Sequence, residues 1–290
     1  MEHHARRQEF DELTDHKAIY HQLIETAEEL GNNQSSSNMH SLMRSIRESN
    51  YIVHGGQYRT RRFMNTCVLD SLLAGCHIAA NVYPNIKQLF EQDFTVNAVM
   101  TLLDRKKYEE AKALWLINVD LRNGHIKHFA ESDYIDIRGY VKDHLPNFLD
   151  LTSAKYHFED DRRSPNPEDR VYSTTLSKFE EFGDVRALGP KSNPQLILVD
   201  VDGRTDGFPA LIITDDYGRE FKLQFLLLGK TTEYSNHMVL CTSLAGGWWL
   251  YDDVVTPLFR EVQMKDLQNQ GHEVHLAAYV HVPAKNGKQD

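Results

Sequence analysis

The chain of 290 residues is long enough to bury a substantial core, as one large domain or as one domain with an accessory segment. Its hydrophobic content of 41% and aromatic content of 10% are ordinary for a globular protein. With 42 acidic against 32 basic residues, the net charge is −10. This balance argues against a general nucleic-acid binder, because such proteins neutralise phosphates with a basic surface.

The chain has three cysteines, which are Cys67, Cys76 and Cys241. An odd number without any Cys-x-x-Cys pair is a poor disulfide framework and excludes a four-cysteine zinc ribbon. The first residues are charged, and apolar runs such as 225–228 are too short to span a membrane. We therefore expect a cytoplasmic or nuclear protein with no membrane or nucleic-acid partner, and we predict neither a metal nor a cofactor.

The first 50 residues read as a helical extension. Apolar positions recur at helical spacing over residues 10–30, and Gly31 is placed to end that helix. A polar linker follows over 32–38, and a second short helix is predicted over 39–48. We divide the chain into this extension (1–50), a main domain (51–284) and a C-terminal tail (285–290).

Near residue 194 of the main domain, the spacing of apolar residues changes from that of helices to that of strands. Before that point, helices are predicted over 67–80, 85–91, 95–103, 107–116 and 138–148, followed by a charged loop with prolines over 159–170. After it, short strands are predicted over 195–200, 210–213, 221–227, 237–241, 247–251 and 274–282. A helical half followed by an antiparallel half predicts the α+β class.

Cys67 stands at the start of an apolar helical run. At such a position the free amide N–H groups and the helix dipole favour a thiolate, which is the nucleophilic form of cysteine. Cys76 lies inside the same helix, and Cys241 lies on a strand with apolar neighbours, so we interpret both as core residues. Cys67 is therefore the candidate nucleophile.

His237 and Asp252 are the candidate partners of Cys67. A thiol hydrolase needs an imidazole that pairs with the thiolate and protonates the leaving amine, and an acid that orients the imidazole. His237 begins one predicted strand, and Asp252 follows the next strand, so a tight hairpin would bring them together. Asp253 is the alternative orienting acid, since adjacent residues on a strand face opposite sides.

Two segments resemble the ubiquitin-specific protease superfamily. The run Asn65-Thr66-Cys67, continued over 68–73, is similar to that family's cysteine box, although Asp70 stands where the family usually has asparagine. Asn236-His237 followed by 248–253 resembles its histidine box. The strands at 194–198 and 278–282 resemble two further family strands. The resemblance covers about 51–284. Because the chain has no zinc-binding insertion, it resembles the compact SUMO-isopeptidase branch as much as it resembles typical ubiquitin proteases.

The resemblance implies a papain-like fold with a helical thumb and an antiparallel β palm. It implies a cysteine isopeptidase that cleaves after the C-terminal Gly-Gly of ubiquitin or a ubiquitin-like protein, SUMO-like modifiers included. Carried over by position, Cys67 is the nucleophile, His237 the general base and acid, and Asp252 the orienting acid.

The residue at one position differs from the family pattern, and this position affects the expected rate of catalysis. The family commonly has an oxyanion-stabilising asparagine five residues before the cysteine, and here that residue is Arg62. Arg62 and Asn65 are the candidates to complete the oxyanion hole with the Cys67 main-chain N–H. Two alternatives therefore stay open: a catalytically impaired module that binds the modifier, or a papain-like peptidase or acyltransferase with another substrate.

Overall fold

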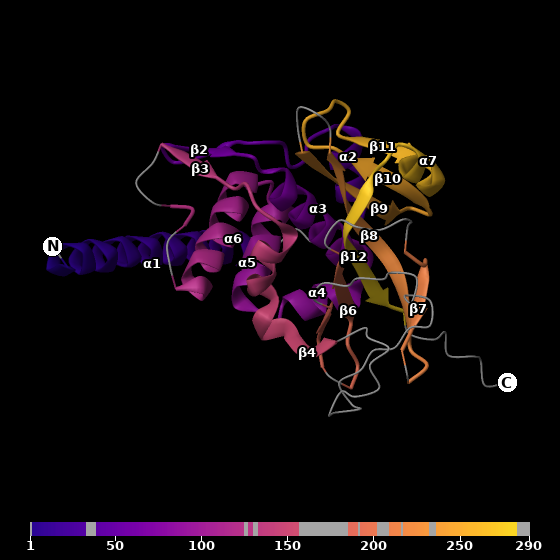
Figure 1. Ribbon diagram of the computed structural model, residues 1–290, viewed down its shortest axis with the longest axis horizontal. Coiled ribbons are helices and arrows are strands. Elements are labelled where there is room, and N and C mark those ends of the chain that lie inside the picture. Colours follow the sequence, from indigo (N-terminus) through magenta and orange to yellow (C-terminus); the bar gives the residue numbers. More distant parts are fainter. Residues whose placement is uncertain are drawn as a thin grey trace.

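The computed structural model describes residues 2–32, 39–124, 127–129, 133–156, 185–190, 192–201, 209–215, 217–231 and 236–282, with side chains for all of these except 2–13, 153–156 and 231. The predicted charged loop at 159–170, nearly all of the linker and the tail lie outside these residues. Within them, the fold class is α+β with a large antiparallel sheet, as predicted (Figure 1). No helix in the described part is both long and apolar enough to cross a membrane.

The helical half is built around one central helix. Its elements are α1 (Glu2–Asn32), α2 (Met39–Arg47), α3 (Cys67–Val82), α4 (Pro84–Phe90), α5 (Phe94–Asp104), α6 (Tyr108–Asn123) and the 3-10 helix η1 (Val141–Leu151). The central helix is α3, which is buried from Val68 through Ala80 and is apolar on nearly every side, as a helix enclosed by other elements must be. The predicted helices are all found, but α1 and α6 are longer than expected, and the helix predicted over 138–148 is the 3-10 helix η1 at Val141–Leu151.

The β half is one long sheet. Its strands run in the order β11 (Phe259–Val262), β10 (Gly247–Tyr251), β9 (Asn236–Leu244), β8 (Glu220–Thr231), β12 (Glu273–His281), β6 (Leu196–Asp200), β5 (Val185–Leu188) and β4 (Thr152–Tyr156), and β7 (Ile212–Thr214) pairs with β8. Every pairing described for this sheet is antiparallel. The strands β4, β5 and β11 and the short helix α7 (Met264–Asn269) were not predicted.

A second, small sheet lies next to the start of α3. It consists of β1 (Gln57–Tyr58), β2 (Arg61–Met64) and β3 (Tyr134–Asp136), with β2 antiparallel to β1 and parallel to β3. These strands have two to four residues and mixed polarity, so no alternation of apolar and polar residues predicts them from the sequence. The β1–β2 hairpin separates the loop at 53–56 from Cys67 in the sequence.

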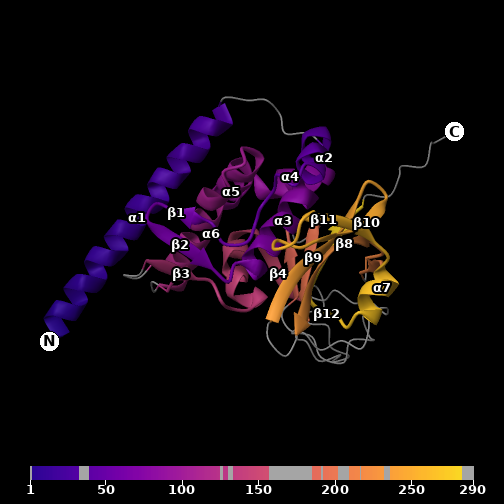
Figure 2. The same cartoon turned by 90° about the horizontal axis from the view of Figure 1, so that it is seen from above.

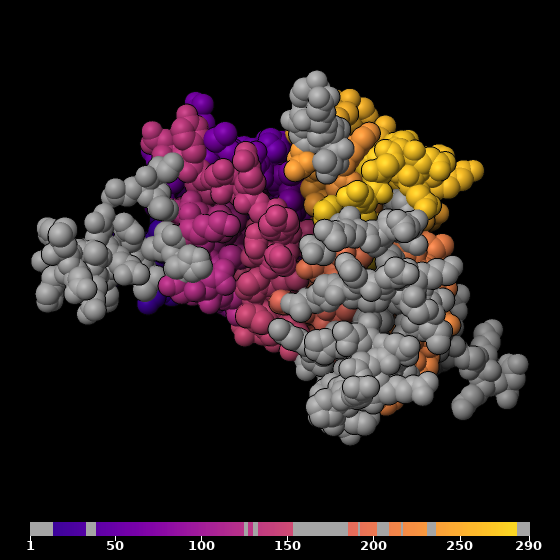
Figure 3. All heavy atoms as spheres, in the orientation of Figure 1, coloured from indigo at the N-terminus to yellow at the C-terminus, as the bar shows by residue number. Residues whose placement is uncertain are grey.

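The two halves meet where α3 packs on β8 and β9. At Gly75, the Cβ atom of any larger residue would lie 2.9 Å from the ring of Phe225 and 3.1 Å from the side chain of Leu240, so only glycine allows this approach. Figure 2 shows α1, α3, α5 and α6 on one side of the sheet and α7 on the other, and Figure 3 shows the helical and β halves meeting at the surface. This close packing holds α3 against the sheet.

The N-terminal helices pack on the main domain. Leu23 and Ile24 of α1 and Leu42 and Ile46 of α2 are buried and belong to the same apolar cluster as α3. The hydroxyl groups of Tyr20 and Thr95, in α1 and α5, lie 2.7 Å apart. The boundary at residue 50 stays a prediction, but the extension shares the core of the domain that follows it.

Candidate active site

Cys67 is the first residue of α3 and is partly exposed, whereas Cys76 and Cys241 are fully buried. The interpretation of those two as core residues is confirmed. The N-cap residue of α3, Thr66, makes no side-chain hydrogen bond to the helix backbone. One turn further along, the Ser71 hydroxyl donates to the main-chain oxygen of Met238 at 3.4 Å, linking α3 to the strand that carries His237.

The β9–β10 hairpin brings His237 and Asp252 together. Ala245 and Gly246, both with positive φ, form a two-residue turn between Leu244 and Gly247, which face each other in the register. The end of β10 therefore returns to the start of β9. Nε2 of His237 lies 2.9 Å from Oδ1 of Asp252, confirming the contact that the spacing predicted.

Asp252 and Cys67 both change the pKa of His237. Its hydrogen bonds with Asp252 and with Cys67 raise its pKa from 6.5 to about 10, while burial acts in the opposite direction. Burial also works to raise the pKa of Asp252, but hydrogen bonds from His237 and from the Val254 N–H lower it below 3.8. Asp252 and Cys67 thus both favour the charged form of the imidazole, which is protonated at neutral pH.

Asp253 has a different partner from Asp252. One of its oxygens, Oδ2, lies 3.0 Å from Nδ1 of His54, and the other, Oδ1, lies 3.6 Å from Nε2 of His237. The main-chain N–H of His54 donates to the main-chain oxygen of Asp253 at 3.1 Å. The hydroxyl of Tyr251 donates to the main-chain oxygen of Ile52 at 2.9 Å, so the segment before His54 runs alongside the end of β10.

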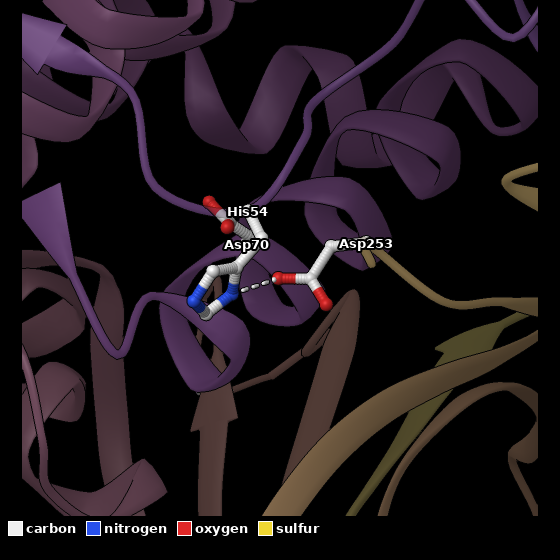
Figure 4. Close-up of side chains that lie close together, drawn as sticks. All are labelled: His54, Asp70 and Asp253. Carbon is white, nitrogen blue, oxygen red and sulfur yellow. Dashed lines mark hydrogen bonds and ion pairs between the residues drawn. The ribbon is translucent and has the colours of Figure 1, made fainter. Parts of the chain in front are cut away.

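A buried ionic network lies behind Cys67. Nζ of Lys112 is 2.8 Å from Oδ1 of Asp70, and it donates to the main-chain oxygens of Val53 and Gly55 at 2.8 Å each. Burial raises the pKa of Asp70 to about 7 and raises that of Asp253 above its ordinary value. Figure 4 shows Asp70, His54 and Asp253 close together below the loop that contains His54.

Thr66 connects this network to the candidate nucleophile. Its hydroxyl donates to Oδ2 of Asp70 at 2.5 Å and accepts from the Gly55 N–H at 2.7 Å. The same hydroxyl lies 3.3 Å from Nδ1 of His54. The residue immediately before Cys67 is therefore fixed to the loop and to the first turn of α3.

Arg62 and Asn65, the two oxyanion candidates, are placed differently. Arg62 is exposed on β2, where it pairs with Gln57 and Tyr134. The Asn65 side-chain amide donates to Oδ1 of Asp136 at 2.8 Å, so this donor is already engaged. The oxyanion role of either side chain stays a prediction that these contacts do not favour.

Two groups of side chains have the composition of a metal site. The potential ligand atoms of His54, Asp70 and Asp253 lie within 4.8 Å of one another, as do those of His237, Asp252 and Asp253. In the first group the ammonium group of Lys112 already pairs with Asp70. In the second, the imidazole of His237 already pairs with Asp252. We therefore interpret both groups as parts of a hydrogen-bond network, and we assign no metal to them.

Sequence reasoning missed His54, Lys112 and the role of Asp70. His54 comes near Cys67 only because the β1–β2 hairpin folds away between them. A weaker signal was available for the other two, since each is a charged residue inside an otherwise apolar helical run. A buried charge needs an opposite charge, so two such residues would have been candidates for a pair.

Comparison with solved structures finds SAGA deubiquitinating (DUB) modules. The Ubp8/Sgf11/Sus1/Sgf73 module is 9% identical over 82% of this chain and 69% of that chain, with a TM-score of 0.39. The SAGA DUB module bound to monoubiquitin is 7% identical over 83% and 71%, with a TM-score of 0.45. No protein-family model and no curated protein sequence matches the chain. At these identities and scores no family is assigned to this chain.

Proposed function

We propose that this protein is a cysteine hydrolase in which Cys67 attacks a carbonyl carbon and His237 transfers the protons. The observation that carries the proposal is the 2.9 Å contact between His237 and Asp252, together with the effect of Cys67 on the pKa of the same imidazole. In this arrangement Asp252 holds Nε2 of the imidazole, leaving Nδ1 for the cysteine. The helical and β halves would then be the thumb and palm of a papain-like fold.

The proposed substrate class is an amide or isopeptide bond after the C-terminal Gly-Gly of ubiquitin or a ubiquitin-like protein. Its support is the similarity of 65–73 and 236–253 to the cysteine and histidine boxes of ubiquitin-specific proteases. In the proposed reaction the thiolate forms a thioester with the glycine carbonyl, and the imidazolium protonates the leaving amine. Water then attacks the thioester, with neutral His237 accepting its proton.

Labelling with modifier probes tests this function. Ubiquitin, SUMO and related modifiers that carry a C-terminal propargylamide should form an adduct with the wild-type protein, detected as a mass increase. Cys67→Ala should abolish the adduct, whereas Cys76→Ala, which removes a buried thiol from the same helix, should retain it. Adduct formation by none of the probes would overturn the proposed substrate class.

The same experiment separates the two other functions. A module that only binds the modifier would bind ubiquitin or SUMO in a calorimetric titration and would form no adduct at Cys67. A peptidase or acyltransferase with another substrate would show a Cys67 that reacts with iodoacetamide faster than Cys76 and Cys241 but forms no adduct with any modifier.

A further inference from the structure

His54 contacts the residue before the candidate nucleophile, although the β1–β2 hairpin separates the two in sequence. The contact runs through Thr66, whose hydroxyl lies 3.3 Å from Nδ1 of His54 and accepts the N–H of Gly55 at 2.7 Å. Cys67 is the next residue and opens α3. The loop at 53–55 therefore borders the helix end at which the substrate carbonyl would be attacked.

The imidazole of His54 is held on one side only. Its Nδ1 contacts Oδ2 of Asp253 at 3.0 Å, and its main-chain N–H donates to the main-chain oxygen of the same residue at 3.1 Å. Figure 4 shows the other ring nitrogen, Nε2, on the side of the ring away from Asp253. The side chain is 36% exposed, so this nitrogen can reach a ligand in the site.

Buried charges fix the loop that presents His54. Lys112 is 1% exposed and binds the main-chain oxygens of Val53 and Gly55, the residues on either side of His54. Its charge is balanced by Asp70, which is also fully buried. Burying such a pair is unfavourable by several kcal/mol per ion before their attraction is counted. A loop held this firmly has the rigidity that electrostatic stabilisation of a transition state requires.

We propose that His54 is a catalytic residue whose Nε2–H, together with the main-chain N–H of Cys67, binds the oxyanion of the tetrahedral intermediate. The inference rests on the proposed acyl-transfer reaction. As the sulfur–carbon bond forms, the carbonyl π electrons move to oxygen, and the two N–H groups donate hydrogen bonds to that oxygen. When the intermediate collapses, the carbon–oxygen double bond re-forms, the carbon–nitrogen bond breaks, and the amine leaves with the proton of His237.

The protonation of the cluster is consistent with a donor at Nε2. Burial lowers the pKa of His54, so its ring is neutral at neutral pH and carries a single hydrogen. Burial raises the pKa of Asp253, which works toward a protonated carboxyl at this position. When Asp253 donates that proton to Nδ1 of His54, the single hydrogen of the neutral ring is on Nε2. Among the nearby charged groups, Asp70 acts to raise the pKa of His54, whereas Lys112 and His237 act to lower it and keep the ring neutral.

Two reactions of Cys67 separate an oxyanion role from a structural one. Acylation by p-nitrophenyl acetate passes through an oxyanion and is followed as a burst of p-nitrophenolate. Alkylation by iodoacetamide uses the same sulfur and forms none. For His54→Ala we expect acylation and ubiquitin-aminomethylcoumarin hydrolysis to slow by about 100- to 1,000-fold, the loss typical of one oxyanion donor. Alkylation of Cys67 should stay within about twofold of wild type, because it needs only the nucleophile.

Two further substitutions of His54 and one control substitution test whether the loss of acylation comes from the missing N–H donor. His54→Asn keeps an N–H donor and should recover at least about tenfold of the lost acylation rate, while His54→Phe keeps a ring without a donor and should behave like alanine. His281→Ala, which removes another partly buried histidine that packs on Phe221, is the control and should acylate like wild type. Unfolding midpoints of all variants show whether each is folded.

Three results would overturn the role of His54. These are acylation within about twofold of wild type in His54→Ala, an equal loss of acylation and alkylation, and a His54→Phe variant as fast as His54→Asn. The acetate ester contains no modifier, so the test does not depend on the substrate class. A protein that hydrolyses no modifier but loses acylation in His54→Ala would contradict the proposed substrate and retain the oxyanion assignment.

Discussion

Lys112 and Asp70 form an ion pair with both side chains out of contact with water, at 2.8 Å from Nζ to Oδ1 and with at most 1% of either side chain exposed. Removal of one partner leaves a buried charge without its counterion. We therefore predict that Lys112→Met and Asp70→Asn each lower the free energy of unfolding by about 3–5 kcal/mol. Urea denaturation monitored by tryptophan fluorescence measures the change.

The double variant Lys112→Met/Asp70→Asn is the control for this prediction. It removes both charges, so it should be destabilised by less than the sum of the two single changes, with a coupling of at least about 1 kcal/mol. Strictly additive losses would contradict a coupled pair and would mean that each side chain acts through other contacts.

Asp252 and Asp253 should differ in their effect on turnover, because only Asp252 lies within hydrogen-bonding distance of His237. We predict that Asp252→Asn lowers kcat by about 100- to 10,000-fold, since the imidazole loses the carboxylate that orients and charges it. Asp253→Asn should lower kcat less. Steady-state hydrolysis of ubiquitin-aminomethylcoumarin provides both values. A larger loss in Asp253→Asn would transfer the orienting role to Asp253.

The raised pKa of His237 predicts how the free energy of unfolding depends on pH. Its pKa is raised from 6.5 to about 10 in the folded protein, so the folded state holds this proton more tightly than the unfolded state. The resulting stabilisation is fully present below pH 6.5 and is lost as the pH rises through about 10. The difference in unfolding free energy between wild type and His237→Gln should shrink over that range.

Nuclear magnetic resonance of the histidine side chains checks the cause directly. The His237 ring signals of the wild-type protein should titrate near pH 10, and those of Asp252→Asn should titrate lower, because the hydrogen bond with Asp252 is the largest contribution to the shift. An unchanged midpoint in Asp252→Asn would rule out Asp252 as the main cause.

Gly75 should be sensitive to a single added methyl group. The Cβ of alanine would lie 2.9 Å from the Phe225 ring, so α3 or the ring must move. We predict that Gly75→Ala lowers the free energy of unfolding by about 1–3 kcal/mol. Gly31→Ala is the matched control inside α1, where the nearest atom of Thr101 is 3.7 Å away. That change should be neutral or stabilising by up to about 1 kcal/mol, from helix propensity, and equal effects would contradict the packing argument.

The division into halves was predictable because long helices and buried strands have clear apolar periods. The strands β1–β3 were not, since two to four residues of mixed polarity carry no period. The partnership of His237 and Asp252 could be inferred because a single hairpin joins them. The position of His54 depends instead on tertiary contacts with Thr66 and Asp253, which no local pattern encodes.

The hydroxyl of Thr66 has consequences for how the site can move. As the N-cap residue of α3 it would ordinarily bond the helix backbone, a contact worth about 1 kcal/mol, yet here it serves Asp70 and the Gly55 N–H. The Thr66 side chain therefore does not occupy the N–H groups at the start of the helix. Because this hydroxyl and the Lys112–Asp70 pair both tie the loop at 53–55 to α3, we expect the loop and the first turn of α3 to move only together. A change that displaces the loop should therefore also displace Cys67.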